Sequence, residues 1–297
     1  MADSSSVSGY VLWVFFFVLG SAIGSFLNVC IHRLPREESI IHPRSHCPKC
    51  GATLGTLELV PILSYVVLGG RCRHCKARIS PRYFLVELSC GLAFVGVWQV
   101  YGVRAQGAAD FARLAASWVL AACLIGAFFT DIDTLIIPDE FTITPMLLGV
   151  AVDCFEIVSG VRPAVALRDP FSGWTLYLPA SIVGLVMGAA IFAFMEIFSQ
   201  LVFKKEGMGG GDLKLAAGIG AMFGPGRLLV STGMAVLAGA LVGAGFLLAR
   251  RRPAQGYMPF GPFIVIAAIA MLLWPEVLSA LAARGWETWR QLSFPNA

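Results

Sequence analysis

Residues 11–31 read VLWVFFFVLGSAIGSFLNVCI, a run of 21 residues without a charged side chain. A hydrocarbon core about 30 Å thick is crossed by about 20 helical residues, so this run is long enough to span it. A second uncharged run of 22 residues covers 228–249. No basic segment precedes the first run and no A-x-A-like site follows it, so we expect a retained span rather than a cleaved signal peptide.

The composition of the whole chain agrees with these two runs. The 297 residues are 57% hydrophobic and 13% charged, whereas a soluble domain carries about 25% charged residues. The sequence therefore predicts an all-α polytopic membrane protein and excludes a large soluble domain. We expect about eight transmembrane helices, at roughly 10–31, 83–103, 114–131, 141–158, 175–203, 212–224, 228–249 and 257–282.

The distribution of lysine and arginine predicts the orientation. With the N-terminus outside, the segments left inside are 32–82, 131–141, 203–214 and 250–256, and they hold 15 of the 22 basic residues. We therefore expect both termini outside and the first long loop in the cytoplasm.

That loop, residues 32–82, contains two C-x-x-C pairs, CPKC and CRHC, with 21 residues between them. Four thiolates suit a tetrahedral zinc ion, and cytoplasmic disulfides are disfavoured. The pattern predicts a small structural zinc-knuckle domain between helices 1 and 2, with redox chemistry or idle thiols as the alternatives. The expected ligands are Cys47, Cys50, Cys72 and Cys75.

Two aspartates are the candidate catalytic residues. Asp212 follows Gly209, Gly210 and Gly211 and leads into an apolar run, and Asp131 ends the third predicted span. The eight-span topology places both at one membrane face. Two adjacent carboxylates share a proton, so one can act as general base and the other as general acid. The glycines would let a substrate backbone approach closely.

Asp212 also has a structural interpretation. An aspartate before an apolar helix is a good N-cap, and Asp131 could mark the point where a span meets the headgroups. These roles are compatible with catalysis, so the residues alone leave both open.

Several motifs resemble those of the type IV prepilin peptidase family. GGGD (209–212), followed by LKLAAGIGAMFG, resembles the family's G-x-G-D motif, and DIDTLIIPDEFT (131–142) resembles its first aspartate motif. Four further segments resemble the family's amino-terminal module: GSFLNVCIHRLP (24–35), CPKCGATL (47–54), PILSYVVLGGRCRHC (61–75) and PRYFLVELSCG (81–91). The resemblance runs from about residue 20 to 250.

The resemblance implies an aspartyl endopeptidase of the bacterial cytoplasmic (inner) membrane, with its active site facing the cytoplasm. It would cut the basic leader from prepilins and pseudopilins, with catalytic residues Asp131 and Asp212. The four-cysteine loop implies a second activity, N-methylation of the new terminus with S-adenosylmethionine. No dinucleotide-type G-x-G-x-x-G motif accompanies it, so the residues that bind this donor are unknown. Asp133 and Asp139 remain possible assistants.

The implied domains are a first transmembrane helix (1–31), a cytoplasmic zinc-binding loop (32–82) and a seven-helix membrane peptidase domain (83–297). The expected partners are the pilin substrates and the lipid bilayer, without nucleic acid, and the oligomeric state stays open. Three alternatives remain: a transporter or channel with a proton relay, a scaffold without catalysis, and a G-x-G-D protease for other substrates such as preflagellins.

Overall fold

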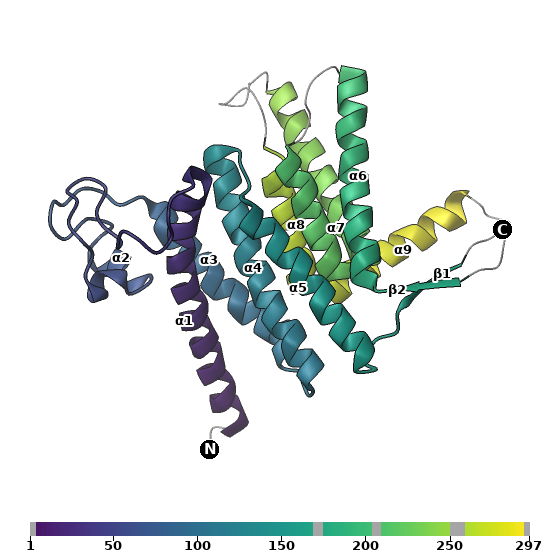
Figure 1. Ribbon diagram of the computed structural model, residues 1–297, viewed down its shortest axis with the longest axis horizontal. Coiled ribbons are helices and arrows are strands. Elements are labelled where there is room, and N and C mark those ends of the chain that lie inside the picture. The colour runs from purple at the N-terminus through teal and green to yellow at the C-terminus, as the bar shows by residue number, and fades with distance from the viewer. Residues whose placement is uncertain (1–3, 169–174, 204–208, 250–258, 294–297) are drawn as a thin grey trace. The chain divides into compact units, whose positions relative to one another are not determined.

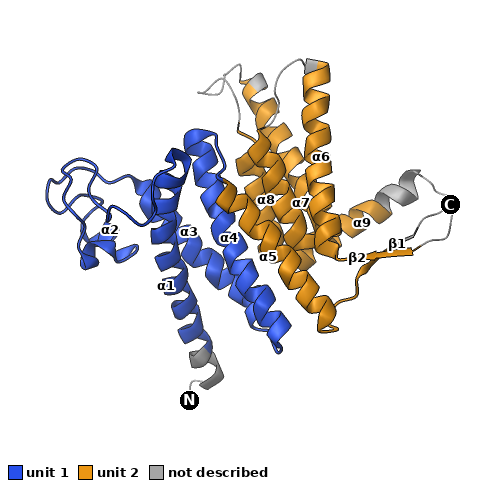
Figure 2. Ribbon diagram, viewed as in Figure 1, with its two compact units in different colours: residues 1–138 blue, residues 139–297 orange. Residues whose placement is uncertain are grey.

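The computed structural model describes residues 4–168, 175–203, 209–249 and 259–293 (Figure 1). Within these residues the secondary structure is helical except for one two-stranded hairpin, which confirms the all-α class. The chain divides into two compact units, residues 1–138 and 139–297 (Figure 2).

The first unit contains three long helices and a compact module between the first two. The long helices are α1 (Ser4–Arg33), α3 (Pro81–Val97), which continues into the π-helical turn η3 (Trp98–Gly102), and α4 (Ala108–Thr134). We call residues 34–80 the cysteine module. It contains η1 (Leu34–Arg36), η2 (Thr56–Leu59) and α2 (Leu63–Val67).

Small residues let α1 and α3 approach closely. A Cβ atom added to Gly20 would lie 2.6 Å from the Cys90 carbonyl oxygen, and one added to Gly24 would lie 2.8 Å from the Cα atom of Glu87. Close backbone approach through glycine is the usual way in which helices pack inside membranes. The α1–α3 pair therefore forms a firm base for the module that connects them.

The second unit contains α5 (Asp139–Val158), the hairpin β1 (Val165–Arg168) and β2 (Thr175–Leu178), and the helices α6 (Ala180–Phe203), α7 (Gly210–Leu248), α8 (Gly261–Leu273) and α9 (Pro275–Ser293). The span predicted over 175–203 starts too early. Thr175–Leu178 pairs with Val165–Arg168 as a strand, and the helix begins at Ala180, where Asp153 accepts a hydrogen bond from Ser181 N at 2.7 Å.

Helix α7 contains two of the predicted spans, 212–224 and 228–249, joined across a kink. Gly224 has φ 74° and ψ 175°, which is not helical, and Pro225 follows it. Only glycine adopts such an angle without strain, and proline suits the first turn of the helix that restarts. The sequence predicted an interruption between residues 224 and 228, and the structure has a kink there, but α7 counts as one candidate span and not as two.

The last predicted span, 257–282, is also not a single straight helix. It consists of α8 and α9, which are bent by 105°. Part of the prediction lies outside the described residues: residues 257 and 258 of this span, the inside segment 250–256, and residues 204–208 of the inside segment 203–214.

Six described helices are long and apolar enough to cross a membrane, and counting the bent pair as one span gives seven. The eight predicted segments correspond to these seven because α7 contains two of them. The finding indicates a multi-pass membrane protein. The assignment of segments to the inside and outside stays a prediction.

Candidate active site and metal centre

The four predicted metal ligands come together in the cysteine module. The Sγ atoms of Cys47, Cys50, Cys72 and Cys75 all lie within 4.8 Å of one another, and those of Cys47 and Cys75 are 3.9 Å apart. A tetrahedral ion with metal–sulfur bonds of about 2.3 Å separates its sulfurs by about 3.8 Å. The cluster can therefore hold one metal ion with little rearrangement.

Two knuckles with the same backbone hydrogen bonds build this cluster. In the first, Cys47 N donates to Ala52 O and Gly51 N donates to Cys47 O, both at 2.9 Å. The second knuckle repeats both bonds around Cys72, with Lys76 N donating to Cys72 O at 3.0 Å. Gly51 and Lys76 occupy equivalent positions with positive φ, 71° and 60°. Each C-x-x-C pair is thus held by a tight turn.

The knuckle turns also favour the ionised thiol of the first cysteine in each pair. Backbone N–H groups of Cys50 and Lys49 donate to the Cys47 sulfur and lower its pKa to about 6. Equivalent N–H groups in the second knuckle lower the pKa of Cys72. Because the thiolate is the form that binds a metal, the first cysteine of each pair is prepared for coordination.

Asp131 lies in the last turn of α4, in the first unit. Its side chain is buried, with 6% exposed, and its carbonyl oxygen accepts a hydrogen bond from Leu135 N at 3.0 Å. Leu135 has φ 55°, which ends the helix in a left-handed cap. The Thr134 hydroxyl donates to Thr130 O at 2.8 Å and reinforces the same turn. The helix end that carries Asp131 is therefore well defined.

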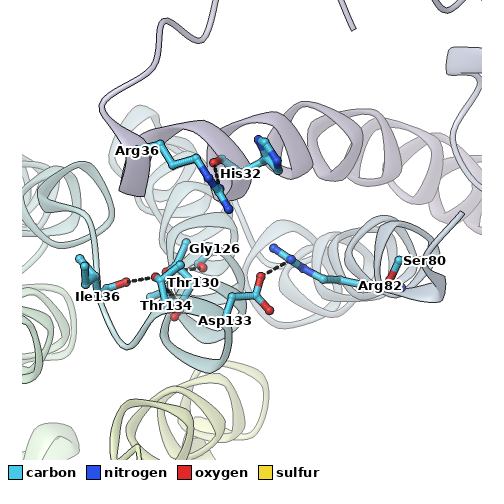
Figure 3. Close-up of polar contacts among 10 residues, drawn as sticks. His32, Arg36, Ser80, Arg82, Gly126, Thr130, Asp133, Thr134 and Ile136 are labelled. Carbon is cyan, nitrogen blue, oxygen red and sulfur yellow. Dashed lines mark hydrogen bonds and ion pairs between the residues drawn. The ribbon is translucent and has the colours of Figure 1, made fainter. Parts of the chain in front are cut away.

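An ion pair from α3 reaches this helix end. Arg82, in the first turn of α3, pairs with Asp133 (Figure 3). Its guanidinium lies 5.9 Å from the centre of the Phe129 ring. The two charged side chains are 29% and 33% exposed. Ser80 caps α3 by accepting from Arg82 N at 3.3 Å. Arg82, which follows the cysteine module and Pro81, is thus linked to the turn of α4 that bears Asp131.

Asp212 lies in the first turn of α7, in the second unit, and is also buried with 6% exposed. Its backbone N–H donates to Gly209 O at 3.0 Å. Within the described part of the chain, a Cβ atom added to Gly210 would meet nothing within 4 Å. The described residues therefore leave open space beside Gly210, two residues before a buried carboxylate. The roles of Gly209 to Gly211 and of Asp212 in the predicted motif stay predictions.

Glycines hold the first half of α7 against its neighbours. A Cβ atom added to Gly149 of α5 would lie 2.6 Å from the backbone of Ala221, and one added to Gly188 of α6 would lie 2.5 Å from Ala216 O. At the start of α7, Lys214 pairs with Asp139 at 2.7 Å. These contacts fix the orientation of the helix that carries Asp212 and give Asp139 a structural partner.

The sequence did not predict the contacts that involve Arg82 and Glu87. Glu87 Oε2 accepts a hydrogen bond from Ile62 N at 2.7 Å. Arg82 is an isolated arginine at the start of a span. Neither residue lies in a spacing pattern with its partner, so no sequence signal pointed to these pairs. The pairing of Asp131 with Asp212 in one dyad stays a prediction.

Family models match most of the chain. The bacterial peptidase A24 N-terminal domain matches residues 18–101, and the type IV leader peptidase family matches residues 118–248. No solved structure matches this chain.

Curated relatives match over 84–90% of this chain. A prepilin leader peptidase/N-methyltransferase from Aeromonas hydrophila is 34% identical over 294 residues, which covers 90% of this chain and 93% of the relative. A protein of the same name from Myxococcus xanthus is 38% identical over 251 residues, covering 84% of this chain and 68% of the relative. A third, from Burkholderia pseudomallei, is 32% identical and covers 87% and 84%. Together with the two domain matches, this similarity establishes that the chain belongs to the type IV leader peptidase family.

Proposed function

We propose that this protein is a membrane aspartyl endopeptidase that removes the leader of type IV prepilins and pseudopilins and then methylates the new N-terminus. The observation that carries the proposal is the pair of buried carboxylates, Asp131 in the last turn of α4 and Asp212 in the first turn of α7 beside an open glycine segment. The names of the curated relatives support both activities.

The proposed cleavage uses the two carboxylates with one shared proton. The ionised one removes a proton from water, whose oxygen then attacks the scissile carbonyl carbon. The protonated one donates a hydrogen bond to the carbonyl oxygen and later protonates the amine as the C–N bond breaks. The open space at Gly210 would admit the extended substrate backbone near Asp212.

We further propose that the metal held by the cysteine module is zinc. Four cysteine sulfurs in tetrahedral spacing are typical of structural zinc sites, which have no open position for a catalytic water. Residues 32–82 would then be a metal-stabilised domain, and residues 83–297 the peptidase domain. S-adenosylmethionine would supply the methyl group, and the attacking nitrogen is the amine that cleavage exposes.

The proposed location is the bacterial inner membrane, with both aspartates at the cytoplasmic face. The excess of lysine and arginine in the segment 32–82 supports this orientation. A proton relay would need acids that pass protons to one another, but two other buried acids have a backbone N–H or an arginine as partner. Asp153 accepts from Ser181 N, and Glu156 Oε2 lies 3.6 Å from the Arg162 guanidinium. A transporter function therefore has less support than proteolysis.

The direct test combines the purified protein in lipid nanodiscs with a purified prepilin and S-adenosylmethionine. N-terminal sequencing and mass spectrometry of the product should find one cut after the leader and one added methyl group. An intact prepilin, under conditions in which the protein is folded and carries its metal, would contradict the proposed peptidase activity. A cut product without the methyl group would contradict the second activity alone.

A further inference from the structure

We propose that the cysteine module rests on the membrane and inserts one face of α2 among anionic phospholipids. Leu63, Val66 and Val67 lie three and four positions apart and so share one face of α2. They are 62%, 62% and 82% exposed, and the nearby Leu57 of η2 is 75% exposed. Such a concentration of exposed aliphatic side chains in a small module indicates a binding surface.

The opposite face of α2 packs on the membrane-spanning helix α3. The Tyr65 ring lies 5.5 Å, centre to centre, from the ring of Phe84, and the Tyr65 hydroxyl donates to Ile79 O at 3.5 Å. Just before α2, Ile62 N donates to the buried carboxylate of Glu87 at 2.7 Å. These contacts leave the aliphatic face of α2 pointing away from the protein.

The anchors on α3 determine the depth of α2. With a rise of about 1.5 Å per residue, Phe84 and Glu87 lie about 4.5 and 9 Å along the helix from Pro81. The helix from Pro81 is long and apolar enough to span the membrane. Interfacial amphipathic segments sink about 5–10 Å into the boundary between headgroups and acyl chains. Helix α2 is therefore held at the depth of that boundary.

The picture of the first unit agrees with this placement. The cysteine module lies beside the C-terminal half of α1 rather than beyond its end (Figure 1). A module that extended into the cytoplasm would lie past the ends of α1 and α3. In this placement the aliphatic face of α2 faces lipid and not water.

The charge of the module identifies the class of lipid. Residues 34–80 contain seven basic and three acidic residues, and Arg71, Arg73 and Lys76 are exposed. Basic segments next to spans are attracted to anionic headgroups. A second copy of this chain would instead bring another positively charged module to the same face. An acidic phospholipid can bury the aliphatic side chains among its acyl chains and attract the basic side chains to its headgroup.

Photocrosslinking of the full chain tests this proposal without any need for enzyme activity. Benzoylphenylalanine is placed at Val67, at the exposed span residue Leu92 as a positive control, and at the exposed Lys49 of the first knuckle as a matched module control. Each protein is assembled in nanodiscs of phosphatidylethanolamine and phosphatidylglycerol, irradiated and analysed by mass spectrometry. Metal content equal to that of the unsubstituted protein verifies that the module is folded.

The probe at Val67 should give phospholipid adducts with a yield close to that at Leu92 and well above that at Lys49. Adducts should decrease when phosphatidylcholine replaces both lipids. Three results would overturn the proposal: no lipid adduct at Val67, an adduct only with a second protein copy, or equal yields at Val67 and Lys49. Equal yields at Val67 in the two lipid mixtures would overturn the assignment to anionic lipid.

A pair of substitutions provides a second, independent test. With the probe at Leu63, the variant Val66→Asp/Val67→Asp should reduce the lipid adduct about tenfold, the change expected when burial of a valine side chain is lost. The matched variant Val66→Ala/Val67→Ala should reduce it less. An unchanged yield in the aspartate variant, with metal content retained, would contradict insertion of this face.

Discussion

The link between Arg82 and Asp133 predicts that cleavage depends on a residue outside the proposed dyad. Arg82 follows the cysteine module, and its partner lies two residues after Asp131. Removing the guanidinium should loosen the last turn of α4 and leave Asp133 as an unneutralised charge beside that turn. The substitution is Arg82→Gln. Asp133→Ala and the double variant complete a double-mutant cycle with the unsubstituted protein.

The coupling free energy between Arg82 and Asp133 follows from their exposure and from the position of the guanidinium. Fully exposed ion pairs contribute about 0.2–1 kcal/mol, and this pair is only about one third exposed. The guanidinium 5.9 Å from the Phe129 ring centre adds a cation–π contribution of about 0.5 kcal/mol or more. We therefore expect a coupling of about 1 kcal/mol, which changes a rate or binding constant about fivefold.

The assay is kcat/KM for prepilin cleavage by the four proteins in nanodiscs. Each single variant should lose about fivefold, and the double variant should lose little more, because both changes remove one interaction. Arg78→Gln is the matched control, since it removes an exposed arginine four residues before Arg82, and should leave kcat/KM unchanged. The reasoning would be refuted if the double variant lost the product of the two single-variant factors in kcat/KM, or if Arg78→Gln lost as much kcat/KM as Arg82→Gln. Amide exchange at Leu135, whose N–H closes the helix end, should be faster in Arg82→Gln.

Three further predictions address the dyad, the metal and the knuckle turns. Asp131→Asn and Asp212→Asn should each abolish cleavage without lowering the amount of inserted protein, and their losses should not add; substantial cleavage by either purified variant would remove the dyad from consideration. Elemental analysis should find one zinc per chain and less in Cys47→Ser, which should still cut the prepilin but leave its new N-terminus unmethylated; loss of cleavage in a stably inserted Cys47→Ser protein would assign the module to the peptidase site instead. In chelator competition, Lys76→Gly should slow metal release and Gly51→Ala should accelerate it, each about fivefold, because a left-handed backbone costs a residue with a Cβ atom about 1 kcal/mol; the same rate in both variants would contradict this account of the turns.

Apolar runs and breakers predicted most of the helices. The run 10–31 lies within α1, because it is uncharged over the length of a bilayer. The predicted span 141–158 nearly coincides with α5, although it contains Asp153 and Glu156. The predicted bounds 212–224 and 228–249 leave a gap at the kink, where glycine followed by proline interrupts the helix. By contrast, the strand Thr175–Leu178 continues directly into an apolar helix, so composition did not separate them. Its partner strand, Val165–Arg168, determines its conformation.

The site could be predicted only as far as local patterns reached. The C-x-x-C spacing identified the four cysteines because a knuckle is a local turn, and the cluster forms as expected. The contacts of Arg82 with Asp133 and of Glu87 with Ile62 join residues 51 and 25 positions apart. Such contacts depend on how α3 packs against α4 and against the module, and no periodicity in the sequence encodes them.

The two knuckles also determine which part of the module is free to change in length. Within each knuckle the spacing is fixed, because the same two backbone hydrogen bonds enclose two residues between the cysteines. Between the knuckles lie 21 residues, which include η2 and α2, and α2 is held on α3 by Tyr65. Only the turns that join these elements are free, and doubling a flexible loop costs only about 0.6 kcal/mol. A search for distant chains with this module should therefore hold each C-x-x-C pair constant and allow the turns around η2 and α2 to vary in length.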